Sequence, residues 1–227
     1  MSNNRVSFKA VVQFGTKVIS STGKSARAVL AGVDGVAFFV PALFLGEALA
    51  IIKAHLAGDT DKLLIVEGEG SFTMDRYTRS DGEKVFAPVL KVESVKPLRA
   101  NLKTIEASNG GVRLANGKMR TVFDGVLVAD SRDPHPEFGQ KLLLKEQTAD
   151  RKAAFVFVRV PTAQAITAKK GQALTVEGRV TRLFPNGKEK GPETGIAAAS
   201  IKLSDAIAIS TPAPTGVEED LVDSLPF

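Results

Sequence analysis

A stretch with the pattern of a β-hairpin occurs twice in this chain, and it limits the possible folds more than any other feature. At Lys62–Pro97 an apolar strand with a Val-Glu-Gly step leads to a polar tip at Asp81-Gly82, and an alternating strand returns. Roughly a hundred residues later, Gln172–Ile209 repeats this order with a second Val-Glu-Gly step and an Asn186-Gly187 tip. Self-similarity over such a distance indicates two copies of one structural unit.

The segments before the first hairpin predict three strands and a helix. Alternating apolar residues indicate strands at Val6–Phe14, Arg27–Ala31 and Val36–Val40. A helix is predicted next, because apolar residues recur at spacings of four, three and four, and Gly58 then supplies a stop. The apolar face of this helix consists of Leu45, Leu49, Ile52 and Leu56. Three strands, a helix and two strands form the element order of the oligonucleotide-binding (OB) barrel.

The second half of the chain predicts the same order less tidily. Strands are indicated at Thr121–Ala129, Lys141–Lys145 and Ala153–Val160, and Pro161–Lys170 predicts a shorter helical insert. We therefore expect a mainly β protein with two tandem OB-fold barrels, each of five strands and a short helix, and a disordered acidic C-terminal tail. The expected boundaries are 1–100 for the first barrel, 101–119 for a linker, 120–210 for the second barrel and 211–227 for the tail. The alternative is a single large β-sandwich in which the tripeptide recurs by chance.

The composition argues against several kinds of chemistry. The chain has no cysteine, so disulfides and thiol catalysis are excluded, and its two histidines make a histidine metal site improbable. Gly23-Lys24-Ser25 resembles the end of a phosphate-binding loop, but Val18 stands where that loop requires a glycine. No apolar run approaches the ~18 residues of a membrane span, and the N-terminus lacks the apolar core of a signal peptide. We expect a cytoplasmic, non-enzymatic protein without cofactor or metal.

Charge is divided unevenly along the sequence. The chain has 30 Lys and Arg against 25 Asp and Glu, a formal net charge of +5. Residues 211–227 contain four acidic residues and no basic one, so the remainder is more basic than the whole chain. A basic body suggests a polyanionic partner, and the acidic tail suggests a separate role.

Binding of single-stranded nucleic acid requires cations that follow the phosphates and flat rings on which bases stack. In an OB barrel the loop between the fourth and fifth strands is a contact surface, and both hairpin tips here carry basic and aromatic residues. Of the neighbouring Phe38 and Phe39, one ring must face the core, and Phe39 is the expected outward one. The candidate nucleic-acid-binding residues are Lys9, Lys17, Arg27, Phe39, Arg76, Tyr77, Arg79, Lys84, Arg159, Arg179, Arg182, Phe184 and Lys188.

The last residues form a second candidate site. A spacer rich in proline, Thr211–Gly216, precedes an acidic segment that ends in Leu225-Pro226-Phe227. A large ring beside the terminal carboxylate suits a hydrophobic pocket with a basic rim. Acidic residues, an aliphatic residue, proline and a terminal phenylalanine resemble the tail tip of bacterial and phage-type single-stranded DNA-binding proteins. The run from Phe44 to Gly68 is similar to the same segment of that family's OB domain.

The resemblance implies sequence-nonspecific binding and protection of single-stranded DNA in replication, recombination or repair. By the same resemblance, the tail would recruit replication and repair proteins, and a homodimer would supply four OB domains. The implied partner-binding residues are Asp220, Asp223, Leu225, Pro226 and Phe227. The chain would act in a bacterial cytoplasm, or in that of the host if a phage encodes it. Unlike the usual family chain it has two apparent OB domains, no tryptophan and a less acidic tail. An OB-type protein-interaction or RNA-binding module remains the alternative.

Overall fold

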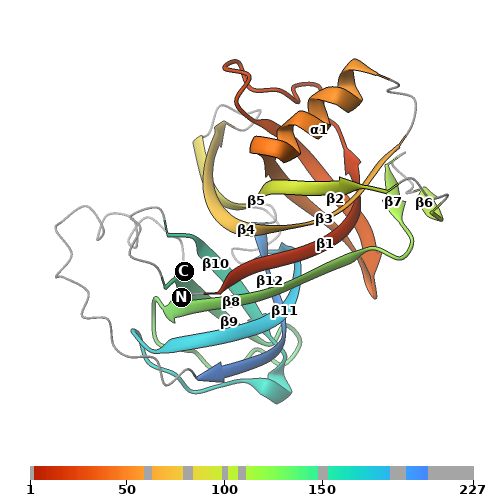
Figure 1. The fold of residues 1–227 in the computed structure, drawn as a ribbon. Helices are drawn as coiled ribbons and strands as arrows, with labels where there is room; N and C mark the ends of the chain where they lie inside the picture. Colours follow the sequence, from red (N-terminus) through yellow and green to blue (C-terminus); the bar gives the residue numbers. More distant parts are fainter. Residues whose placement is uncertain are drawn as a thin grey trace.

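The computed structural model describes residues 3–58, 63–78, 84–98, 102–106, 111–147, 153–184 and 193–203. As predicted, the described residues are mainly β-strands, and they include one α-helix (Figure 1). All strands belong to one sheet, whose pairings close into two rings.

The first ring contains five strands, and α1 lies between the third and fourth of them. β1 pairs antiparallel with both β2 and β4, β2 pairs with β3, and β3 pairs parallel with β5, which returns to β4. These elements are β1 (Asn4–Gln13), β2 (Ala26–Asp34), β3 (Val36–Phe44), α1 (Gly46–Ala57), β4 (Leu64–Thr78) and β5 (Lys84–Pro97). The predicted strands and helix of this half are therefore confirmed, and Gly58 ends the helix as expected.

The second ring repeats the pairing scheme. β8 pairs with β9 and β11, β9 pairs with β10, and β10 pairs parallel with β12, which pairs with β11. Its strands are β8 (Lys118–Leu127), β9 (Gln140–Glu146), β10 (Phe155–Val160), β11 (Ala173–Leu183) and β12 (Glu193–Leu203).

The helical insert predicted at Pro161–Lys170 is wrong in extent, since the structure forms only the 3-10 turn η1 (Thr162–Gln164). The reason lies in the backbone donors that follow the turn. The N–H of Ile166 donates to Gln140 Oε1, and the N–H of Ala168 donates to Ser131 Oγ. These donors are satisfied by side chains of β9 and of the loop before it instead of by carbonyls one helical turn earlier, so no α-helix propagates.

The segment expected as a linker contains two short strands. β6 (Thr104–Glu106) and β7 (Val112–Leu114) pair antiparallel, and Leu114 also pairs with Gly32 of β2. The Leu114 side chain is buried against Val11 and Ile65 in a small cluster separate from the main core. Residues 102–106 and 111–114, called the β6–β7 segment below, are thus packed against the first ring.

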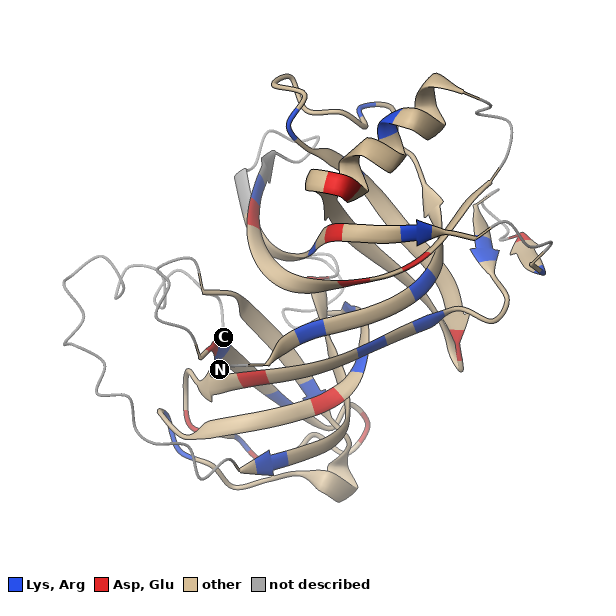
Figure 2. Cartoon of the chain, in the orientation of Figure 1, with Lys and Arg blue, Asp and Glu red and all other residues tan. Residues whose placement is uncertain are grey.

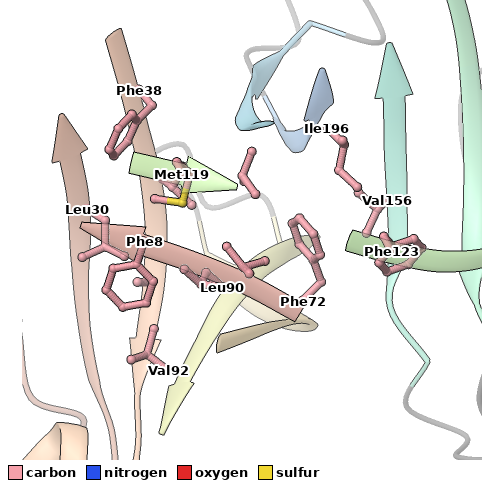
Figure 3. Packing of buried hydrophobic residues seen from close by; sticks show 14 of the residues in the cluster. Phe8, Leu30, Phe38, Phe72, Leu90, Val92, Met119, Phe123, Val156 and Ile196 are labelled. Carbon is pink, nitrogen blue, oxygen red and sulfur yellow. The ribbon is translucent and has the colours of Figure 1, made fainter. Parts of the chain in front are cut away.

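One hydrophobic core runs through both rings. Phe72 of β4 and Phe123 of β8 are buried and meet edge to face, with 5.7 Å between ring centroids (Figure 3). β1 also pairs with β8 from Asn4 to Lys9, which joins the two rings through their backbones. The packing is therefore continuous across the junction.

The two hairpins are equivalent through their bulges and not through the repeated tripeptide. The pairing register shifts at Glu69/Gly70 in the first hairpin and at Glu177/Gly178 in the second. A Cβ atom on Gly70 would lie 2.4 Å from the carbonyl oxygen of Lys91, and one on Gly178 would lie 2.3 Å from that of Ala197. Gly178 therefore corresponds to Gly70, two residues beyond the Gly68 that the sequence pairs with it. A bulge that brings two backbones this close requires a glycine.

Replacing Gly178 by alanine should destabilise the fold by more than 1 kcal/mol, because the added methyl group meets backbone that cannot rotate away. Gly15→Ala is the matched control, since a Cβ at Gly15 meets no atom within 4 Å. Urea unfolding of both variants measures the difference. Equal stability of the two variants would contradict the assignment of Gly178 to a crowded bulge.

Candidate nucleic-acid interface

The strand registers place Phe39 and Phe155 at equivalent positions of the two rings. In β5, Leu90 lies two residues before Val92, the partner of the bulge glycine Gly70. In β12, Ile196 lies two residues before Ala198, the partner of the bulge glycine Gly178. Leu90 and Ile196 pair with Ala42 of β3 and Val158 of β10, respectively. Counting three residues back along each strand leads to the two phenylalanines.

Both phenylalanines project from the outer face of their ring. Neighbouring side chains of a strand point to opposite faces, and Phe38 and Val156 are in the core with 1% and 0% exposure. Phe39 and Phe155 are half-buried on the other face. Each ring therefore presents an aromatic side chain outward from the middle of its third strand, on the face that OB barrels use for oligonucleotides.

A cation lies over the aromatic side chain of each of these two phenylalanines. The Arg113 guanidinium carbon is 4.7 Å from the centroid of Phe39, and Lys145 Nζ is 5.8 Å from that of Phe155. Phe157, two residues further along β10, is 5% exposed, and Lys141 Nζ of β9 lies 5.6 Å from the centroid of its ring. Sequence reasoning missed Arg113, Lys141, Lys145, Phe155 and Phe157. The alternation of valines with Phe155, Phe157 and Arg159 was the available signal.

Lys141 combines charge with partial desolvation. Burial lowers the pKa of Lys141, the nearby positive charge of Arg132 lowers it further, and Glu193 opposes both. In the register comparison Lys141 is equivalent to Arg27, because each lies opposite the last outward residue of its third strand, Arg159 and Leu43 respectively. Both rings therefore carry a basic residue at this place.

Arg27 is tied to the first hairpin. Its Nε and Nη2 atoms donate to the carboxylate of Asp75 at 3.0 and 3.1 Å, and Nη2 also reaches the carbonyl oxygen of Arg76 at 3.4 Å. A two-pronged contact of this kind fixes the guanidinium geometrically. The contact between Arg27 and Asp75 fixes β4 beside the first residues of β2.

The same hairpin carries a further cation–aromatic pair and touches the second ring. Arg76 lies over Phe86 at 5.5 Å from the ring centroid, and Phe86 is 42% exposed. Met74, on the same face of β4 as Arg76, accepts a hydrogen bond at Sδ from the N–H of Phe155 at 3.4 Å. This contact brings the hairpin of the first ring beside the outer face of the second.

At the other end of that face, Arg159 holds a loop with aromatic residues. Arg159 Nε donates to the carbonyl oxygen of Phe138 at 2.8 Å. Phe138 is 60% exposed, and its ring lies 4.7 Å from that of His135. Arg159, Phe157 and Phe155 therefore form a line of outward side chains on β10 that begins at this aromatic loop.

Arg179 lies in the junction between the rings and not on an open tip. One of its terminal nitrogens donates to the carbonyl oxygen of Asp34, the last residue of β2. The Asp34 carboxylate accepts hydrogen bonds from the Arg120 side chain at 2.8 Å and from the Met119 N–H at 3.2 Å. Arg179 and Arg120 thus fasten β11 and β8 to the first ring.

The remaining candidates are dispersed. Lys9 is half-buried on β1 and pairs in register with Lys118 of β8, and Figure 2 shows basic residues spaced along both strands. Lys17, Arg182 and Phe184 are exposed, Lys17 in the loop after β1 and the other two near the end of β11. The side chains of Tyr77 and Lys84, and all of Arg79, Lys188 and the tail residues Asp220, Asp223, Leu225, Pro226 and Phe227, lie outside the described residues.

The described residues contain neither a membrane-spanning helix nor a cluster of metal ligands. No helix among them is long and apolar enough to cross a membrane. Within the same ranges, no three histidine or carboxylate side chains gather as they would around a metal ion.

Comparisons with known proteins detect similarity in structure only. No protein-family model matches the chain, and no curated protein matches its sequence. Among solved structures, an engineered deletion variant of the single-stranded DNA-binding protein from Thermus aquaticus is similar, with a TM-score of 0.63 and 19% sequence identity. The match covers 91% of this chain and 96% of that chain. At this identity the likeness shows the fold, which agrees with an OB-type barrel.

Proposed function

We propose that this protein binds single-stranded DNA without sequence preference and has no catalytic activity. The observation that carries the proposal is the equivalent placement of Phe39 and Phe155, each on the outer face of a third strand and each with a cation over its ring. Stacking of bases on such rings tolerates any sequence, because every base has a flat face.

The phosphates would follow the cations around these rings. On the second ring Lys141, Lys145 and Arg159 surround Phe155 and Phe157 on one face. Arg76 and Phe86 continue the surface on the adjacent hairpin, where Met74 touches the backbone of Phe155. A single strand lying on this face would meet the half-buried ring of Phe155 and the exposed ring of Phe86 together with these cations, which is the combination that binding of single strands needs.

The finer parts of the proposal concern organisation and role. The matched pairing registers support two OB domains, with the β6–β7 segment between them and the acidic tail after 210. A homodimer would then hold four such domains. The protein would protect single strands during replication, recombination or repair, in a bacterial cytoplasm or that of a phage host. The tail, through Asp220, Asp223, Leu225, Pro226 and Phe227, would recruit replication and repair proteins, since its chemistry suits a basic-rimmed apolar pocket.

The proposal is tested by fluorescence anisotropy with a labelled oligo-dT at several salt concentrations. We expect tight binding to the single strand, little binding to duplex, and a logarithm of affinity that falls linearly with that of salt by about 0.7 per neutralised phosphate. Oligo-rU in parallel measures the preference between DNA and RNA. Lys170→Ala is a suitable control, because this exposed residue lies in the loop between η1 and β11 and not on β9 or β10.

Absence of binding to oligo-dT at low salt would contradict the proposal. The outer faces would then serve contacts with protein, as in the alternative of an OB-type interaction module. Stronger binding to oligo-rU than to oligo-dT would instead favour the RNA-binding alternative.

A further inference from the structure

The two equivalent phenylalanines are covered in different ways. Over Phe155 lies Lys145, which comes from the neighbouring strand and pairs with it directly in register. The residue at that register position in the first ring is Ala31, whose side chain is too short to reach over a ring. The cation over Phe39 comes instead from Arg113 of β7, outside the ring of strands.

The backbone on both sides of Arg113 is held in place. The carbonyl oxygen of Val112 accepts a hydrogen bond from Gln13 Nε2 at 2.6 Å, and Leu114 is buried against Val11. Arg113 is therefore aimed at Phe39 by its neighbours, while its side chain remains the movable part. Its Nε is buried and makes no hydrogen bond in the described structure, so the guanidinium keeps unused capacity for a stronger acceptor.

We propose that Arg113 occupies the place of a base on Phe39 and that the two exchange when a single strand binds. A planar guanidinium stacks on a ring much as a base does, and a base stacks on a ring more strongly than an exposed cation does. The displaced guanidinium then turns to a phosphate, which it binds with two parallel donors. Because Arg113 covers Phe39, the first ring of strands binds a single strand only at higher oligonucleotide concentrations than the second. This inference rests on the proposed function.

The test is photocrosslinking of an oligo-dT that contains 5-bromodeoxyuridine, with the modified residues located by peptide mass spectrometry. Titration at raised salt reduces the phosphate contribution of Arg113 and leaves stacking as the main difference. In the unmodified protein, Phe155 should crosslink at lower oligonucleotide concentrations than Phe39, and both should crosslink at saturation.

In Arg113→Ala the concentration for half-maximal crosslinking of Phe39 should fall by at least roughly two- to fivefold, the factor for an exposed cation–π contact, because partial burial of Arg113 strengthens the contact. Phe155 should not change. Truncation to alanine could disturb the β6–β7 segment by itself. Arg113→Met keeps the length of the stem without the cation, so it should lower the half-maximal concentration for Phe39 by the same factor. Lys103→Ala is the matched control, since Lys103 is an exposed base of the same segment and should leave both positions unchanged.

Two results would overturn the inference. If Phe39 never crosslinks in the unmodified protein while Phe155 does, Arg113 is a fixed cover. If Phe39 and Phe155 reach half-maximal crosslinking at the same oligonucleotide concentration with and without Arg113, the guanidinium does not compete with a base. A different outcome, in which no oligonucleotide binds and neither residue crosslinks, refutes the proposed function itself.

Discussion

Replacing Phe155 by alanine should weaken binding of oligo-dT by about 1–3 kcal/mol, which is roughly 5- to 150-fold in the dissociation constant. The expected loss is large because Phe155 combines an outward ring with Lys145 above it and the first hairpin beside it. Anisotropy titration at a single fixed salt concentration measures the change. The salt slope should stay the same, since the substitution removes a ring and no charge.

The matched control for this variant is Ile105→Ala, which removes an exposed apolar side chain from β6 at the edge of the sheet. It should bind oligo-dT as the unmodified protein does. Phe155→Leu tests whether a flat ring is needed, because leucine fills space without offering a face for stacking. If Phe155→Leu binds as tightly as the unmodified protein, bases do not stack at this position.

Replacing Phe123 by alanine should lower the free energy of unfolding by about 3–5 kcal/mol, the usual cost of removing a buried phenylalanine. Phe123 is fully buried, and its edge-to-face contact with Phe72 joins the core of the second ring to that of the first. Urea unfolding monitored by far-UV circular dichroism measures the loss. The exposed Phe138→Ala should change stability by no more than about 0.5 kcal/mol.

A double-mutant cycle isolates the contact between the rings. With Phe72→Ala, Phe123→Ala and the double variant, the coupling free energy should be about 0.5–1.5 kcal/mol, as for other aromatic pairs. Additive losses would show that the side chains of Phe72 and Phe123 do not stabilise one another across the junction.

The elements that the sequence predicts well are those with a local pattern. The spacing of Leu45, Leu49 and Ile52 predicts the apolar face of α1, and the alternation from Val6 to Ala10 predicts β1. The β6–β7 segment has no such pattern, because strands of three residues exist only where a residue such as Leu114 finds apolar partners on distant strands. Its structure depends on tertiary packing.

The candidate interface was harder to predict for two physical reasons. Phe155-Val156-Phe157-Val158 is apolar at every position and is typical of a strand buried on both faces, so in the sequence only the parity with Arg159 indicates that Phe155 points outward. Arg179 has the sequence context of a free cation on a hairpin, yet it binds the carbonyl oxygen of Asp34, 145 residues away. Contacts of that range leave no trace in local sequence.

The pairing of β1 with β8, together with the bonds that Arg179 and Arg120 make to Asp34, has a consequence for avidity. Two binding modules joined by a flexible linker meet a second part of a ligand at an effective concentration set by linker length. Here the two faces are joined by strand pairing and side-chain bonds instead. A single strand long enough to reach both would therefore meet the second face already positioned, without the entropy cost of ordering a tether. The gain in affinity should depend sharply on oligonucleotide length.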